Sequence, residues 1–195
     1  MDLILASTSP YRERLLQRLA LPFRTARPNT DETPYPKEAP DRLAGRLALA
    51  KATSIASQNP AAWVIGSDQT AELEGQLLNK PGDHQNATRQ LRACAGKSLK
   101  FHTGLALVNL NTGYENVVVV PFSVRFRPLS HAQIEGYLRA EQPYDCAGSF
   151  KWEALGIALF ESLEGTDPTS LEGLPLIALT HLLFDIGIDI LLYNN

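Results

Sequence analysis

The chain has 195 residues, of which 44% are hydrophobic and 20% are charged, and its formal net charge is −3. This size and composition suit a globular protein with one domain, or with two small lobes around a cleft. The negative balance excludes a basic field for polymeric nucleic acid, although a few local lysines and arginines could still bind the phosphates of one nucleotide.

The cysteine pattern and the apolar segments favour an intracellular location. Cys94 and Cys146 lie far apart and form neither a CxxC motif nor a metal-ligand spacing, so we expect unpaired thiols in a reducing compartment. The apolar run at the N-terminus is too short for a signal peptide, and the longest apolar stretches have strand length or are amphipathic. We therefore expect a cytoplasmic protein that does not enter a membrane.

The N-terminal part of the chain is predicted to alternate strands and helices. Strands or extended segments are expected at 3–6, 23–26 and 62–66, and helices at 11–19 and 41–57. A polar, proline-rich loop separates the second extended segment from the second helix. The third strand is expected to end at Ser67 and Asp68, which would place Asp68 at a strand end.

The C-terminal part is predicted to be richer in strands. The expected elements are a helix from Asp83 to near Gly96, hairpin strands at 101–109 and 114–127, a helix with a capping box from Ser130 to Arg139, a strand at 156–160 and a helix at 175–187. Because long hairpin strands accompany strand–helix units, we predict an α/β fold with a mixed twisted sheet flanked by helices.

The segment Ser7-Thr8-Ser9-Pro10-Tyr11-Arg12 lies between a predicted strand and a predicted helix. Hydroxyl groups and free backbone N–H groups at a helix start can bind an anion, and Arg12 can form two hydrogen bonds to a phosphate. The alternative is an ordinary helix cap. The segment alone leaves both interpretations open.

Carboxylates and lysines elsewhere could complete a triphosphate site. In open α/β sheets ligands collect at the carboxyl ends of strands, where Asp68 could hold a metal or activate water. The alternative is a carboxylate that only caps a turn or pairs with a lysine. Lys51 interrupts an apolar helix and could instead extend to solvent. Lys80 precedes a turn, and Glu32 lies in the proline-rich loop. Together these charges suit phosphates with Mg²⁺, whereas P-loop, GxGxxG, HExxH and GxSxG motifs are absent from the sequence.

The chain also contains a series of short motifs in a characteristic order. They are Leu5–Arg12, Asp31–Thr33, Ile65–Asp68, Lys80–Pro81, Thr103–Gly104, Cys146–Phe150 and Gly173–Leu176. In this order the motifs resemble the Maf family over almost the whole chain. The resemblance implies one Maf-like domain over residues 1–195, with the two-lobed fold of Maf and inosine triphosphatase proteins around a nucleotide cleft. It also implies a homodimer and hydrolysis of a nucleoside triphosphate to the monophosphate and diphosphate with Mg²⁺ or Mn²⁺.

The resemblance also assigns roles to individual residues. Asp68 matches the family's proton acceptor, and with Glu32 it would hold the metal. The positions that match its phosphate-binding residues are Ser7, Arg12, Lys51 and Lys80. Cationic side chains at these positions would stabilise negative charge that develops on the phosphates during hydrolysis.

Three further positions match those that select the base in this family: Tyr11, Gln69 and Glu153. Gln69 and Glu153 depart from the branch that acts on pyrimidine triphosphates, and the patterns Ser67–Gln69 and Cys146–Lys151 resemble the branch that acts on 7-methyl-GTP. A Glu153 carboxylate could accept the two adjacent N–H donors of guanine, and Tyr11 or Trp152 could contact the cationic methylated ring. The alternatives are a broader house-cleaning hydrolase of modified or pyrimidine triphosphates, and a non-catalytic nucleotide-binding regulator of cell division.

Overall fold

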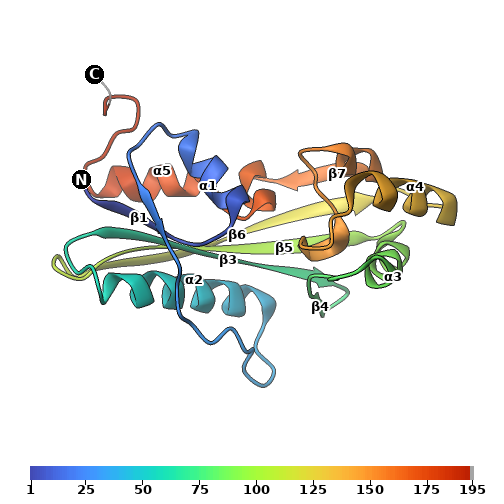
Figure 1. Cartoon of the computed structure of the whole chain (residues 1–195), viewed down its shortest axis with the longest axis horizontal. Coiled ribbons are helices and arrows are strands. Elements are labelled where there is room, and N and C mark those ends of the chain that lie inside the picture. The colour runs from blue at the N-terminus through green and yellow to red at the C-terminus, as the bar shows by residue number, and fades with distance from the viewer. Residues whose placement is uncertain (194–195) are drawn as a thin grey trace. The chain divides into compact units, whose positions relative to one another are not determined.

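A computed structural model describes residues 1–193 of the chain (Figure 1). Its elements follow in the order β1 (Leu3–Ala6), α1 (Pro10–Gln17), β2 (Arg24–Ala26), α2 (Pro40–Ala56), β3 (Trp63–Leu73), β4 (Gln76–Leu78), α3 (His84–Cys94), β5 (Ser98–Asn109), β6 (Tyr114–Phe126), α4 (His131–Glu141), the 3₁₀ helices η1 (Ala147–Ser149) and η2 (Leu155–Leu159), β7 (Phe160–Gly165), the 3₁₀ helix η3 (Pro168–Glu172) and α5 (Leu176–Asp185).

The strands form a mixed sheet in the order β2-β1-β3-β5-β6-β7, with β4 paired to β3. β1 pairs in parallel with β2 and with β3, whereas the β3–β4 and β6–β7 pairs are antiparallel. Parallel pairs need crossover connections, which α1 and α2 provide, and antiparallel neighbours follow from short turns. The predicted α/β fold with a mixed sheet and flanking helices is therefore confirmed.

Contacts between residues divide the chain into two compact units. The first contains residues 1–69, 102–120 and 167–195, and the second contains residues 70–101 and 121–166. Strands β3, β5 and β6 contribute residues to both units. One domain over residues 1–195 stays a prediction.

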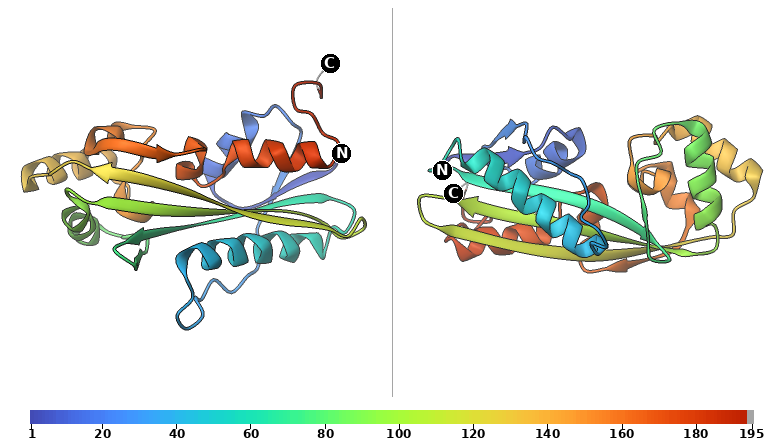
Figure 2. Two further views of the ribbon diagram at one scale, coloured as in Figure 1. Left: turned by 180° about the vertical axis from the view of Figure 1, so that it is seen from behind. Right: turned by 90° about the horizontal axis from the view of Figure 1, so that it is seen from below.

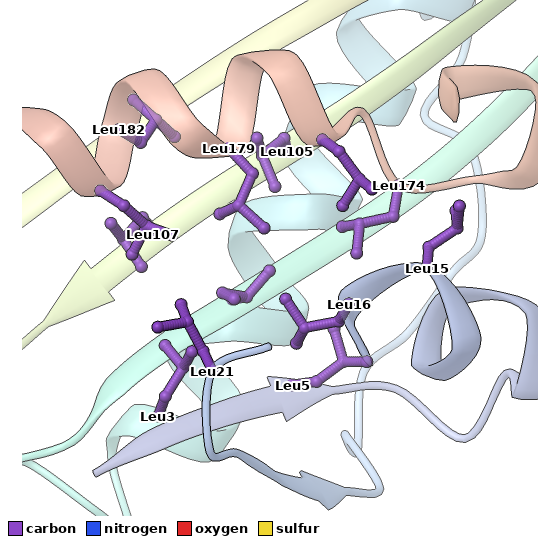
Figure 3. Packing of buried hydrophobic residues seen from close by; sticks show 13 residues of the cluster. Leu3, Leu5, Leu15, Leu16, Leu21, Leu105, Leu107, Leu174, Leu179 and Leu182 are labelled. Carbon is purple, nitrogen blue, oxygen red and sulfur yellow. The ribbon is translucent and has the colours of Figure 1, made fainter. Parts of the chain in front are cut away.

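The sheet of the first unit is covered on both faces (Figure 2). Leucines from β1, α1, β5 and α5 form a cluster on one face, and Leu5, Leu16, Leu105 and Leu179 point toward one another within it (Figure 3). Alanines of α2 pack against the other face. Burial of both faces explains why β1 is continuously apolar.

α2 lies unusually close to the strands beneath it. A Cβ atom built on Gly66 of β3 would lie 2.1 Å from the carbonyl oxygen of Ala48, and one on Gly104 of β5 would lie 2.2 Å from that of Ala44. Glycine at both strand positions is therefore required for this approach of the helix backbone.

The second unit has an aromatic core and well-capped helices. Its edge-to-face ring pairs join Phe101, Phe126, Phe150 and Phe160, an arrangement that aromatic quadrupoles favour. Ser130 forms the predicted capping box at the start of α4, so that prediction is confirmed.

Two sequence predictions about strands are wrong. Residues 155–159 form η2 rather than a strand at 156–160, and β7 begins only at Phe160. Gly156 packs against Lys151, whose carbonyl oxygen would lie 2.2 Å from an added Cβ, so the chain turns tightly there. The third strand does not end at Ser67 and Asp68, because β3 continues to Leu73. Within residues 1–193, none of the helices combines the length and hydrophobicity that crossing a membrane requires.

Candidate active site

A cluster of charged side chains surrounds Asp68 in the first unit. The ammonium group of Lys51, from α2, lies 2.5 Å from Oδ1 of Asp68 and 2.7 Å from Oε1 of Glu32. Lys51 and Asp68 are 6% and 9% exposed, so burial strengthens their attraction while the pairing offsets the cost of desolvation. Lys51 therefore does not extend to solvent. It joins two carboxylates from separate parts of the chain.

The position of Asp68 follows from the alternation of side chains along β3. Val64 belongs to the cluster beneath α2, and Gly66 contacts α2 directly. Asp68 is the next residue with this orientation, since side chains two apart in a strand share a face. The pairing of β1 with β3 stops at Ile65. Asp68 therefore lies beyond the end of this parallel pairing, although not at the end of β3.

Glu32 lies in an irregular loop that Arg46 of α2 holds in place. The Arg46 guanidinium donates two hydrogen bonds to the Glu38 carboxylate, at 2.6 and 2.7 Å, and one to the carbonyl of Thr33 at 3.1 Å. It also stacks on the Tyr35 ring, 4.0 Å from its centroid. Because Thr33 follows Glu32, these contacts fix the backbone next to the carboxylate that meets Lys51.

Arg12 approaches the same charged cluster from α1. Its Nε donates a 2.7 Å hydrogen bond to the carbonyl of Gly173, which also accepts one from Ser67 Oγ at 2.8 Å. Burial lowers the pKa of Arg12, and the negative charges of Asp68 and Glu32 oppose that change. The guanidinium has further N–H donors beyond Nε, which suits recognition of a phosphate.

The segment before Arg12 caps α1 and also brings its hydroxyl groups together. Ser9 is the N-cap residue and accepts from the Arg12 N–H, and Ser7 Oγ accepts from the Ser9 N–H at 3.1 Å. The helix-cap interpretation is confirmed for Ser9. Ser7 is buried, and Tyr11 carries the guanidinium of Arg14 over its ring at 5.1 Å.

Gln69 lies on the opposite face of β3 from Asp68. Its Nε2 donates to the carbonyl of Ser170 at 2.6 Å, and it lies 3.2 Å from Thr103 Oγ1 and 3.3 Å from the carbonyl of Leu171. Ser67, two residues earlier, likewise faces η3 through Gly173. Adjacent residues of one strand thus present a carboxylate to α2 and an amide to η3.

The remaining predicted residues belong to the second unit. Lys80 is exposed between β4 and α3, and Glu153 is exposed between η1 and η2. The indole N–H of Trp152 is buried without a hydrogen-bond partner among the described residues. The first unit contains the other predicted residues, which are Ser7, Tyr11, Arg12, Glu32, Lys51, Asp68 and Gln69.

Sequence reasoning did not assign the residues that hold these side chains in place. Thr103 and Gly173 lie in motifs that carried the family resemblance, so their positions could have been found there. Arg46 has no distinguishing signal, because one arginine on a polar helix face resembles any other. Its function depends on a loop whose path the sequence does not define.

The oxygen ligands present suit a hard divalent cation. Among residues 1–193 no group of three or more His, Cys, Asp or Glu side chains is placed to hold a metal ion. Glu32 and Asp68 nevertheless converge on one point, the ammonium of Lys51. Mg²⁺ commonly takes one or two protein carboxylates and completes its shell with substrate phosphates and water. Glu32 and Asp68 are therefore ligands of the kind that such an ion takes, and the point where they meet is held by the Lys51 ammonium.

An open mixed sheet with paired carboxylates and cations beside β3 defines an α/β protein with a site suited to phosphate chemistry. The family described as "Maf-like protein" matches residues 2–186, and the chain belongs to this family. The resemblance in the ordered motifs is thereby confirmed.

Similar proteins cover nearly the whole chain. A protein of Nitrosococcus oceani is 53% identical over 97% of this chain and 95% of its own length. One of Polaromonas sp. is 57% identical over 90% of this chain and 80% of its own length, and one of Vibrio vulnificus is 52% identical over 97% of both. Each of the three is named 7-methyl-GTP pyrophosphatase.

Proposed function

We propose that this protein hydrolyses 7-methyl-GTP to 7-methyl-GMP and diphosphate. The observation that carries the proposal is the pairing of Asp68 with Lys51, with the partly buried guanidinium of Arg12 near the same carboxylates. Such a site offers a proton acceptor and cations for phosphate oxygens. The names of the relatives support 7-methyl-GTP as the substrate.

In the proposed reaction, a water oxygen forms a bond to the α-phosphorus and the bond from that phosphorus to the bridging oxygen breaks. The diphosphate leaves with the electron pair, and the Asp68 carboxylate accepts the proton of the water. Lys51, with Arg12, stabilises the negative charge that accumulates on the phosphate oxygens. Ser7 would contribute a hydroxyl to phosphate binding, and Lys80 a further cation.

Glu32 and Asp68 would hold the divalent cation, Mg²⁺ or Mn²⁺. When bound, the ion would neutralise phosphate charge and act as a Lewis acid. The clamp of Arg46 on the loop before α2 supports this role of Glu32, because an exposed carboxylate on an unrestrained loop would lose entropy on ordering.

Selection of the base would rest on Tyr11, Gln69 and Glu153. A carboxylate at Glu153 can accept from N1–H and the 2-amino group of guanine, and a nearby negative charge favours the cationic methylated ring. Tyr11 offers an aromatic face to the same cation.

The test is diphosphate release by the purified protein from 7-methyl-GTP, GTP, dTTP and UTP, with Mg²⁺ or Mn²⁺. We expect 7-methyl-GTP to have the highest kcat/KM and Asp68→Asn to lower kcat by at least about 100-fold. Asp185→Asn, at the exposed end of α5, is the matched control and should resemble the wild type. Hydrolysis in ¹⁸O-labelled water should place the label in 7-methyl-GMP. Equal rates for the wild type and Asp68→Asn would refute the assigned role of Asp68.

The same panel separates the alternatives. Similar kcat/KM values for all the triphosphates would favour a broad house-cleaning hydrolase. Binding of nucleotides without turnover would instead favour a non-catalytic regulator. We also propose a cytoplasmic homodimer, as the family resemblance implies, and light scattering after size-exclusion chromatography would give the mass in solution.

A further inference from the structure

The hydrogen-bond partners of Gln69 define which end of its side-chain amide is anchored. The carbonyl oxygens of Ser170 and Leu171 can only accept hydrogen bonds, so the group that faces them has to be the NH₂ of Gln69. The Oε1 atom would find no donor in these two carbonyls, and its partial negative charge would be repelled by theirs. The chemistry of these two partners therefore determines the orientation of the Gln69 amide.

Thr103 strengthens this anchoring. Its hydroxyl donates its single hydrogen to the Ser170 carbonyl at 2.9 Å, so toward Gln69 it can only accept, at 3.2 Å. Thr103 and Ser170 are both fully buried. Three acceptors therefore surround the two amide hydrogens of Gln69, and rotation of the amide would bring its Oε1 against the carbonyl oxygens of Ser170 and Leu171, which is unfavourable.

The loop that supplies these carbonyls is itself rigidly held. The buried carboxylate of Asp167 accepts from the backbone N–H groups of Thr169 and of Ile177, at 3.2 and 2.7 Å. It thereby joins η3 to the first turn of α5. The carbonyl of Asp167 also accepts from the Ser170 hydroxyl at 2.7 Å. The acceptors that face Gln69 therefore cannot adjust freely to a reversed amide.

Among residues 1–193, Oε1 of Gln69 has no hydrogen-bond partner, and it is not one of the buried polar atoms left unsatisfied. The atom is therefore accessible to water or to a ligand. From this geometry we infer that Gln69 acts only as a hydrogen-bond acceptor toward the substrate, that it accepts from the 2-amino group of the base, and that Thr103 is the positioning side chain that reinforces the polarity set by the Ser170 and Leu171 carbonyls.

The 2-amino group is the donor that fits best. This inference rests on the proposed function, in which the base is 7-methylguanine. The positive charge of the methylated ring makes N1–H more acidic, whereas the 2-amino group keeps its hydrogens in both protonation states. It also carries two hydrogens, so it can donate to Gln69 and to a second acceptor.

The experiment compares ligands that differ only in this group. The dissociation constants of 7-methyl-GMP and of 7-methyl-IMP, which lacks the 2-amino group, are measured by calorimetry at a pH where both keep N1–H. We expect the wild type to bind 7-methyl-GMP at least about tenfold more tightly, because 7-methyl-IMP leaves the Gln69 oxygen without a donor. Gln69→Leu should bring the ratio close to one.

Variants of Thr103 test the positioning role. Thr103→Val keeps the shape but removes the hydroxyl, and we expect it to lower the binding ratio by about threefold or more. Thr103→Ser should restore it. Thr180→Val is the matched control, since the Thr180 hydroxyl donates to the carbonyl of Ile177 within its own helix, and it should keep the wild-type ratio.

The outcomes distinguish the inference from the proposed function. A wild-type ratio near one, or a ratio that Gln69→Leu leaves unchanged, overturns the assigned polarity even if 7-methyl-GTP is hydrolysed. Equal weakening of both ligands by Thr103→Val and Thr103→Ser overturns the positioning role. Failure of the wild type to release diphosphate from 7-methyl-GTP refutes the proposed hydrolysis, whereas a preserved ratio would still support the Gln69 assignment.

Discussion

Replacement of Gly66 by alanine should separate the effects of α2 packing on stability and on activity. The new Cβ would lie 2.1 Å from the carbonyl oxygen of Ala48, and 2.8 and 2.9 Å from the backbone nitrogen and Cβ of Ala52. The Ala48 carbonyl would have to withdraw by about 1.3 Å to reach an ordinary contact of 3.4 Å. Backbone atoms of a helix cannot move alone, so α2 as a whole would shift.

The shift would act on the charged cluster as well as on the core. Lys51 belongs to the same turn of α2, and its ammonium lies 2.5 Å from Asp68. A displacement of about 1 Å would lengthen this contact beyond hydrogen-bond range. Overpacking costs about 1–3 kcal/mol in folding free energy, and misplacement of a catalytic group by this distance can lower the rate by about 100-fold.

Urea denaturation and kcat for 7-methyl-GTP would measure the two effects in the same variant. Gly136→Ala is the matched control, because Gly136 lies within α4 and a Cβ there would meet nothing within 4 Å. We expect that control to be unchanged or stabilised by about 0.5–1 kcal/mol, with normal activity. Wild-type stability and kcat in Gly66→Ala would refute the close packing of α2.

Two further outcomes follow from individual side chains. The hydrogen bonds from Arg46 lower the pKa of Glu38 from its ordinary 4.5 to about 2. The stability that this pair contributes is therefore present above about pH 4.5 and lost as the pH falls toward about 2. The Tm of Glu38→Gln should fall less than that of the wild type between about pH 5 and about pH 3, and an equal fall would contradict the role of the Arg46–Glu38 pair. Burial raises the pKa of the Cys94 thiol to about 12, whereas Cys146 is partly exposed. Mass spectrometry after alkylation of the native protein should therefore find Cys146 modified first. Equal alkylation rates for the two cysteines would contradict the burial of Cys94.

Much of the fold could be predicted because its signals are local. Apolar runs marked β1 and the start of β3, and Asp83 and Ser130 marked helix starts through their capping side chains. The strand expected at 156–160 failed for a non-local reason. Gly156 packs against the backbone of Lys151, and no pattern of apolar residues records that contact.

The site could be predicted only as a set of residue types, because its geometry depends on the length of β3. A strand that ended at Asp68 would leave that residue and Gln69 in a loop, free to face the same ligand group. Since β3 continues through both, alternation forces the carboxylate toward Lys51 and the amide toward Ser170. The chemical step and the recognition of the base are therefore assigned to opposite faces of one strand. A change of register by one residue would exchange the faces to which Asp68 and Gln69 point. The contacts of Asp68 with Lys51 of α2, and of Gln69 with Ser170 of η3, hold this short segment in its register.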